Sequence, residues 1–135
     1  MYAKKGLTLA DAKGIAAAAE AEALKNGWSV SIAIVDDGGN LLYLQRLDDA
    51  PVGSVAVAQE KARTAFLFGG PTKAIEDMIA GGRLVMLALP GVTPIRGGLP
   101  LRYEGRVVGA IGVSGAQSSQ DEQVAQAGVQ AASEL

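Results

Sequence analysis

The sequence predicts an α+β fold, in which a five-stranded antiparallel sheet is flanked by helices. Three observations predict it: two pairs of alternating apolar segments are joined by turn sequences, helical periodicity frames them at both ends of the chain, and one short apolar run lies between them. Helices arranged around hairpins in this order cover a layered sheet. At 135 residues, 49% of them hydrophobic, the chain is predicted to be a single domain, 1–135.

The first predicted element is a helix over residues 9–26. Thr8 is a suitable N-cap and Gly27 a suitable end, and small apolar residues recur at helical spacing between them. This pattern indicates a narrow helix face that can pack closely against its neighbour.

A hairpin follows over residues 28–47. The segment "WSVSIAIVD" alternates as a strand does, and "LLYLQRL" at 41–47 returns antiparallel to it. Between them, "DDGGN" at 36–40 is a turn sequence, in which we expect Asp36 to accept an Asx-type hydrogen bond.

Two helices and a strand are predicted for the middle of the chain. Ser54 is expected to cap a helix that runs to Phe68, and Thr72 to cap a shorter one. The apolar run "LVMLAL" at 84–89 ends at Pro90 and is predicted to be the third strand.

A glycine-rich hairpin over residues 96–115 and a final helix complete the prediction. Ser119 and Glu122 have the spacing of a capping box at the start of that helix. Glycine weakens a strand interior, so its abundance in this hairpin needs an explanation. Either the glycines let alanine-rich helices lie close to the sheet, or they let a ligand or another subunit approach the backbone.

The composition excludes several classes of function. The chain has no cysteine and no histidine, which removes disulfides, thiolate nucleophiles, a Ser-His-Asp triad and the commonest ligands for zinc and haem iron. No metal site is predicted. A net charge of −2 without a basic cluster gives no reason to expect nucleic acid. No segment has the pattern of a membrane span or a signal peptide, so a cytoplasmic location is expected.

Lys61 is the first candidate for chemistry. It lies on a stripe of small and apolar residues of the predicted second helix, where partial desolvation would suit a base or a carboxylate anchor. The alternative is that Lys61 reaches solvent or pairs with a carboxylate. Thr64 lies three residues further on and is a candidate for the same face, unless its hydroxyl bonds to the helix backbone.

Two arginines are candidates for binding a carboxylate. Arg46 lies at the end of the first hairpin, with Asp48 as the group that would hold it or act as a proton shuttle; a simple corner ion pair is the alternative. Arg96 precedes Gly97 and Gly98, and a cation beside exposed backbone N–H groups suits a carboxylate or phosphate.

Several segments, in the same order along nearly the whole chain, resemble the GlcG/HbpS-type family. They are "SIAIVDDGGNLLYLQRLDDA" at 31–50, "EKARTAFLF" at 60–68, "GGLPLRYEGRVVGAIGVSGA" at 97–116 and "QDEQVAQAG" at 120–128. The resemblance implies a profilin-like α/β/α sandwich, assembled as a homo-oligomer (dimer or larger). The family is described as haem-binding or haem-degrading, occurs attached to PduO-type corrinoid adenosyltransferases, and has members encoded with pathways for small organic acids.

Four functions remain open at the level of sequence. The first is an oligomeric protein that binds a small anionic organic molecule through Lys61, Arg46, Arg96 and the Gly97–Gly98 backbone. The second is a hydrolase or tautomerase of an unsaturated oxo or hydroxy acid, with Lys61 and Asp48 as catalytic groups and Asp121 or a tyrosine as alternative proton shuttles. The third is haem binding or degradation, which the resemblance implies and the absence of histidine disfavours. The fourth is an assembly domain with no ligand of its own, which a subunit contact through the glycine-rich sheet would favour.

Overall fold

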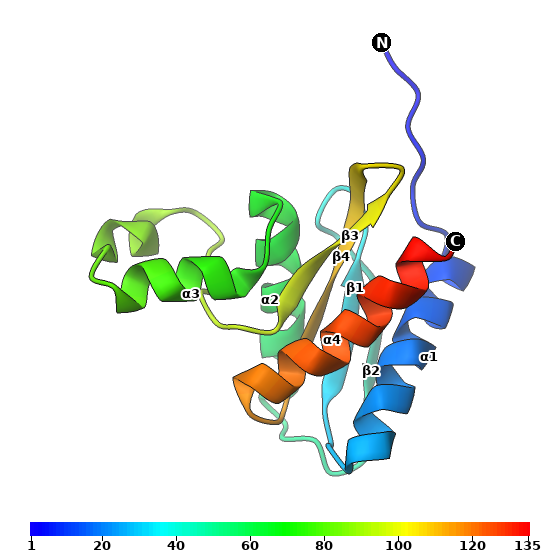
Figure 1. Ribbon diagram of the computed structural model, residues 1–135, viewed down its shortest axis with the longest axis horizontal. Coiled ribbons are helices and arrows are strands. Elements are labelled where there is room, and N and C mark those ends of the chain that lie inside the picture. The colour runs from blue at the N-terminus through cyan, green and yellow to red at the C-terminus, as the bar shows by residue number, and fades with distance from the viewer.

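The computed structural model describes residues 1–135 and shows a sheet covered by helices on both faces (Figure 1). The elements are α1 (Leu9–Asn26), β1 (Ser31–Val35), β2 (Leu41–Arg46), α2 (Ser54–Phe68), α3 (Thr72–Ala80), the 3-10 helix η1 (Leu84–Ala88), β3 (Gly98–Tyr103), β4 (Arg106–Ser114) and α4 (Ser118–Ser133). The α+β class is therefore confirmed. None of the helices is long and apolar enough to cross a membrane.

The sheet has four strands in the order β2-β1-β4-β3, and each neighbouring pair is antiparallel. Both predicted hairpins are present. They join through β1 and β4, whose register runs from Ser31 opposite Ser114 to Val35 opposite Ala110. These two strands form the centre of the sheet, and every residue of β1 is buried.

The helices form two layers. Helices α1 and α4 cover one face of the sheet and α2 covers the other (Figure 1). Alternation along β1 assigns the two faces, since Ile32 and Ile34 join the core with α1 and α4, while Ala33 and Val35 join the core with α2. The arrangement is the α/β/α sandwich that the resemblance implied.

Helix α2 lies unusually close to the sheet. A side-chain carbon added at Gly112 would lie 2.0 Å from the carbonyl oxygen of Ala58, and one added at Gly98 would lie 2.2 Å from that of Lys61. Real side chains do not reach such distances. At these two positions, therefore, glycine is needed because a helix backbone occupies the space.

The predicted strand at 84–89 is wrong. The segment forms η1, with i to i−3 hydrogen bonds from Met86 N to Arg83 O and from Leu89 N to Met86 O. No strand pairs with it, so its backbone groups are satisfied by local turns. A short apolar run predicts a strand only where the sheet offers it an edge, and the sheet consequently has four strands rather than five.

The predicted Thr8 cap is confirmed, and so is the Asx turn. Thr8 and Asp11 form a reciprocal capping box, and Asp36 Oδ1 accepts hydrogen bonds from the backbone N–H groups of Gly38 and Asn40 at 2.9 and 3.0 Å.

Three other predicted cap residues are wrong, although α2, α3 and α4 begin within one residue of the predicted starts. Ser54 Oγ donates to Pro51 O and lies 2.8 Å from Ser31 Oγ. Thr72 lies inside α3 and bonds to Gly98. Helix α4 is capped by Gln117 with Gln120, in place of the predicted Ser119 and Glu122.

The close packing of α2 generates the first prediction. Gly112→Ala should lower the free energy of unfolding by about 3 kcal/mol, since its new methyl group overlaps Ala58 and Ala62. The control is Gly14→Ala within α1, where nothing lies within 4 Å; it should raise stability by roughly 0.5–1 kcal/mol through helix propensity. Urea denaturation measures both, and equal effects of the two changes would contradict this packing.

Candidate functional site

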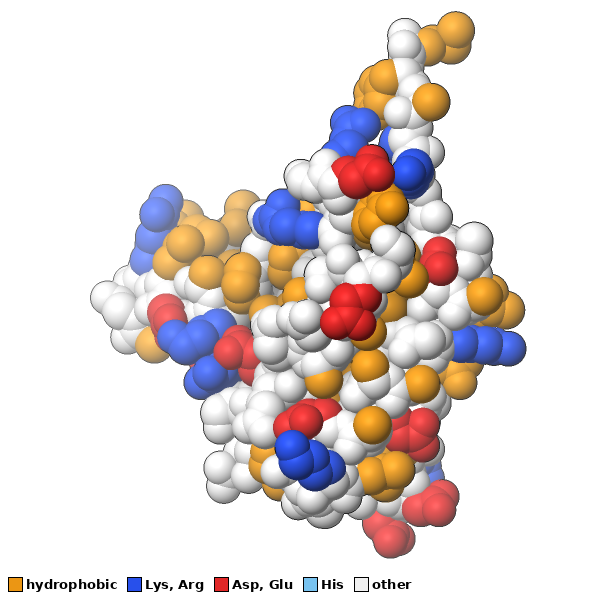
Figure 2. All heavy atoms as spheres, turned by 45° about the vertical axis from the view of Figure 1, so that its right-hand side comes forward, with side chains coloured by type: hydrophobic (Ala, Val, Ile, Leu, Met, Phe, Trp, Pro, Cys, Tyr) orange, Lys and Arg blue, Asp and Glu red, His pale blue; other side chains and the backbone are white.

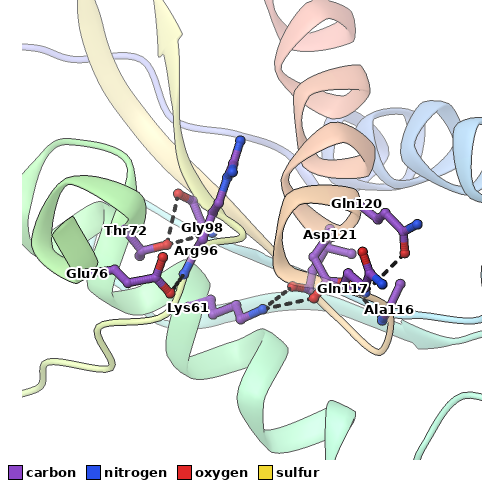
Figure 3. Close-up of polar contacts among 10 residues, drawn as sticks. Lys61, Thr72, Glu76, Arg96, Gly98, Ala116, Gln117, Gln120 and Asp121 are labelled. Carbon is purple, nitrogen blue, oxygen red and sulfur yellow. Dashed lines mark hydrogen bonds and ion pairs between the residues drawn. The ribbon is translucent and has the colours of Figure 1, made fainter. Parts of the chain in front are cut away.

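A buried ion pair connects α2 to the start of α4. Lys61 and Asp121 are 1% and 2% exposed. Lys61 Nζ donates to Asp121 Oδ2 at 3.2 Å and to the carbonyl oxygen of Val113 at 2.9 Å (Figure 3). The sequence correctly indicated a desolvated lysine, and the structure supplies the carboxylate partner that was its alternative explanation.

Asp121 is held from a second direction. Its Oδ1 accepts a hydrogen bond from the N–H of Ala116 at 2.9 Å. Burial raises the pKa of Asp121, while the Ala116 hydrogen bond and the Lys61 charge oppose that rise. The pair therefore fixes three segments relative to one another: α2, the end of β4 and the first turn of α4.

The loop before β3 closes over this pair. Gly97 has φ +132°, and a side-chain carbon there would lie 2.8 Å from Lys61 Nζ. The next residue, Gly98, donates its N–H to Thr72 Oγ1 at 2.9 Å. The backbone of this loop therefore covers the Lys61 amine. Helix α3 holds the loop in place through the hydrogen bond between Thr72 and Gly98.

Arg96 begins this loop and has unused hydrogen-bonding capacity. Its backbone N–H donates to Glu76 Oε1 at 3.2 Å, and its side chain donates to Glu122 Oε1 at 2.9 Å. The Nε atom is shielded from solvent and has no hydrogen-bond partner. The neighbouring Gly97 N–H also donates no hydrogen bond within the chain. Of these two residues, Arg96 is the one that lines a hollow, so its guanidinium is the group that a bound acceptor can reach.

The Arg96 side chain lines an open hollow of about 830 Å³ between α1 and α4. Trp28 and Ala127 are its two apolar residues; the others are Glu22, Ser119, Gln120, Glu122, Gln123, Gln126 and Gln130. A hydrogen bond from Gln123 lowers the pKa of Glu22, so the Glu22 carboxylate is ionised. We call this hollow the amide-lined hollow.

The structure places Arg46 and Asp48 elsewhere. They line a second hollow of about 410 Å³ and form no ion pair with each other. Arg46 ends β2 and Arg96 precedes β3, the two outer strands, so three strand spacings, roughly 14 Å, separate their backbones. Both hollows lie at one end of the sheet, and Trp28 lines both.

Thr64 does not face Lys61's amine. Its hydroxyl donates to Gly91 O at 3.1 Å and accepts from the N–H of Thr93 at 3.0 Å. It therefore anchors the segment that leads from η1 to Arg96. The sequence indicated Asp121 only as a first-turn helix residue or an alternative proton shuttle, because nothing in the spacing links it to Lys61. Trp28 was given no role in a site. No group of three or more acidic side chains is arranged to hold a metal ion.

The fold and this site together define a small α/β/α sandwich protein with a polar hollow beside a buried lysine–aspartate pair. Comparison with known proteins identifies the family. The model of the family described as "Haem degrading protein HbpS-like" matches residues 7–130. Protein GlcG of Escherichia coli is 48% identical over 103 residues, which cover 76% of this chain and 77% of GlcG.

Solved structures agree with this match. A double mutant of HbpS from Streptomyces reticuli superposes with a TM-score of 0.88 at 37% identity, covering 96% of this chain and 89% of that one. A complex of PduOC with haem superposes with a TM-score of 0.84 at 28% identity, covering 94% and 95%. The chain belongs to the GlcG/HbpS-type family.

The buried pair generates the second prediction. Asp121→Ala should lower the free energy of unfolding by about 3–5 kcal/mol, because it leaves the Lys61 ammonium buried without a counter-charge. The double variant Lys61→Met with Asp121→Leu removes both charges and should be more stable than Asp121→Ala. Chemical denaturation compares the two. If the double variant were the less stable one, the ion pair would not be the source of the loss.

Proposed function

We propose that this protein is a homo-oligomer that binds a small organic acid in the amide-lined hollow, with Arg96 as the carboxylate anchor. The observation that carries this proposal is the Arg96 guanidinium, which lines the hollow and makes a single side-chain hydrogen bond, to Glu122. A guanidinium has five N–H donors, and Arg96 uses one of them through its side chain. A ligand carboxylate in the hollow would accept hydrogen bonds from the Nη N–H groups of Arg96 that Glu122 does not use.

The remaining lining favours a ligand that also carries hydroxyl groups. The glutamine side chains of α4 offer both donors and acceptors, and the carboxylates of Glu22 and Glu122 accept hydrogen bonds. Trp28 supplies an apolar wall for the carbon skeleton. A small hydroxy acid matches this lining better than a dicarboxylate, since a second negative charge would face Glu22.

Haem fits the residues of this hollow poorly. The lining contains two apolar residues, whereas a porphyrin needs apolar walls on both faces. The chain has neither histidine nor cysteine to coordinate the iron. The haem complex of PduOC thus concerns a relative with the same fold, and we derive no haem chemistry for this chain.

The hydrolase or tautomerase alternative would need Lys61 or Asp48 to reach a substrate. Lys61 Nζ is buried and used by Asp121 and Val113, and Asp48 lies beside the other hollow. The arrangement favours binding over catalysis by these two groups.

The third prediction uses Trp28, the chain's single tryptophan, as a reporter. Titration with a panel of small hydroxy and oxo acids should change its fluorescence saturably for at least one acid. The uncharged amide of that acid should bind at least tenfold more weakly, because it lacks the charge that Arg96 recognises. Absence of a response across the panel would overturn the proposal.

Matched arginine variants decide which hollow is used. Arg96→Gln should weaken binding of the acid by roughly 10–100-fold. Arg46→Gln should leave the affinity for the acid within about twofold of the wild-type value, although Trp28 lines both hollows. The reverse ranking would assign the ligand to the Arg46 hollow. Circular dichroism shows that each variant keeps the fold.

The fourth prediction concerns haem. Hemin should adsorb without a saturable Soret shift at one equivalent per subunit, because the chain has no imidazole or thiolate and no tyrosine or methionine lines the hollow to ligate the iron. A sharp end point at one equivalent would contradict this expectation and reinstate haem as the ligand.

A further inference from the structure

A segment of the chain projects from the sandwich beside α2. It comprises α3, η1 and the loop to Ile95, and we call residues 72–95 the arm (Figure 1). Two contacts tie α3 to the loop before β3, through Thr72 to Gly98 and through Glu76 to Arg96. By contrast, η1 contains no buried residue, although all five of its side chains are apolar.

Large apolar side chains gather on the arm and on the end of α2 beside it. Figure 2 shows them on the part of the molecule that projects to the left. The most exposed are Leu84 and Val85, at 63% and 67%. The group consists of Leu67, Met78, Leu84, Val85, Leu87 and Ile95. We call this group the arm face.

The arm face is large for a surface left in water. Six side chains, each roughly half exposed, amount to roughly 500 Å² of apolar area, near the upper limit for a monomeric soluble protein. With a rim of polar neighbours it approaches the roughly 800 Å² that each partner contributes to a stable interface. The size of the arm face therefore fits an interface with another protein chain.

The charges on the arm favour a second copy of this chain as that partner. Lys73 and Arg83 balance Glu76 and Asp77, so the arm has no net charge and does not select an acidic or a basic partner. The whole chain carries only −2, so two copies repel weakly. A neutral apolar face is complementary to itself, as a two-fold contact requires.

We propose that the arm face is buried against the arm face of a second copy, about a two-fold axis. This inference specifies the contact in the proposed homo-oligomer, and it does not depend on the identity of the ligand. The proposed contact also affects the amide-lined hollow, because α3 holds Arg96 through Glu76 and Gly98 through Thr72. A contact that restrains the arm restrains the loop that presents Arg96.

The test, the fifth prediction, is the mass of the full chain in solution. Sedimentation velocity should give a dimer or larger for the wild type at micromolar concentration. Val85→Glu with Leu87→Glu should weaken this assembly by roughly a hundredfold, because two charges would enter an apolar contact. Val52→Glu is the matched control: Val52 is 79% exposed but lies outside the arm, so its mass should equal that of the wild type.

A second measurement uses the absence of cysteine in the chain. A spin label on Leu87→Cys should be immobilised in the wild-type assembly, whereas a label on Val52→Cys should stay mobile. A monomeric wild type, an arm variant with the wild-type mass or a mobile label at position 87 would each overturn the inference. So would a monomer that binds neutral phosphatidylcholine vesicles through the arm.

The Trp28 titration on the same samples separates the two proposals. A wild-type dimer that shows no acid response contradicts the ligand alone, whereas a wild-type monomer that binds the acid contradicts the arm contact and leaves the acid site standing.

Discussion

The close contact between α2 and the sheet is the constraint from which the rest of this structure follows. Gly98 and Gly112 allow helix backbone to meet strand backbone, and the alanines of α2 fill the remaining space. At that separation Lys61 has no route to water, so its ammonium needs a carboxylate within the protein. Asp121 supplies it and thereby fixes the start of α4, where the adjacent Glu122 meets Arg96. The geometry around the amide-lined hollow is in this sense a consequence of small residues on the opposite face of the sheet.

Local patterns were sufficient to predict most of the elements. Both hairpins, the helices and the desolvation of Lys61 follow from periodicity and turn residues, because these signals act over a few positions. The failures share one cause, which is that the deciding partner is distant in sequence. The run at 84–89 has the composition of a strand but finds no strand to pair with, and the hydroxyl of Thr72 bonds to Gly98 rather than to its own helix. In the same way, spacing alone shows neither that Lys61 meets Asp121 nor that Arg46 and Arg96 end at opposite edges of the sheet.

Members of one family can share this scaffold and differ in the chemistry of their sites. The chain superposes closely on a haem complex of PduOC, yet its own hollow is lined mainly by amides and carboxylates. A fold fixes where side chains are presented, and the side chains determine which ligand is stabilised. The residues that line the hollow are therefore more informative about a ligand than the overall similarity is.

The strand order has a consequence for how the chain acquires its structure. The central pair joins β1, near the beginning of the sequence, to β4, near its end. During synthesis, the hairpin of β1 and β2 therefore leaves the ribosome before β4 has been made. Until β4 pairs with it, the inner edge of β1 has unpaired backbone N–H and C=O groups. Bringing such remote strands together costs loop-closure entropy before any pairing compensates for it, and this cost slows folding relative to a fold built from local contacts. During that interval the nascent chain is exposed to mispairing with other strands.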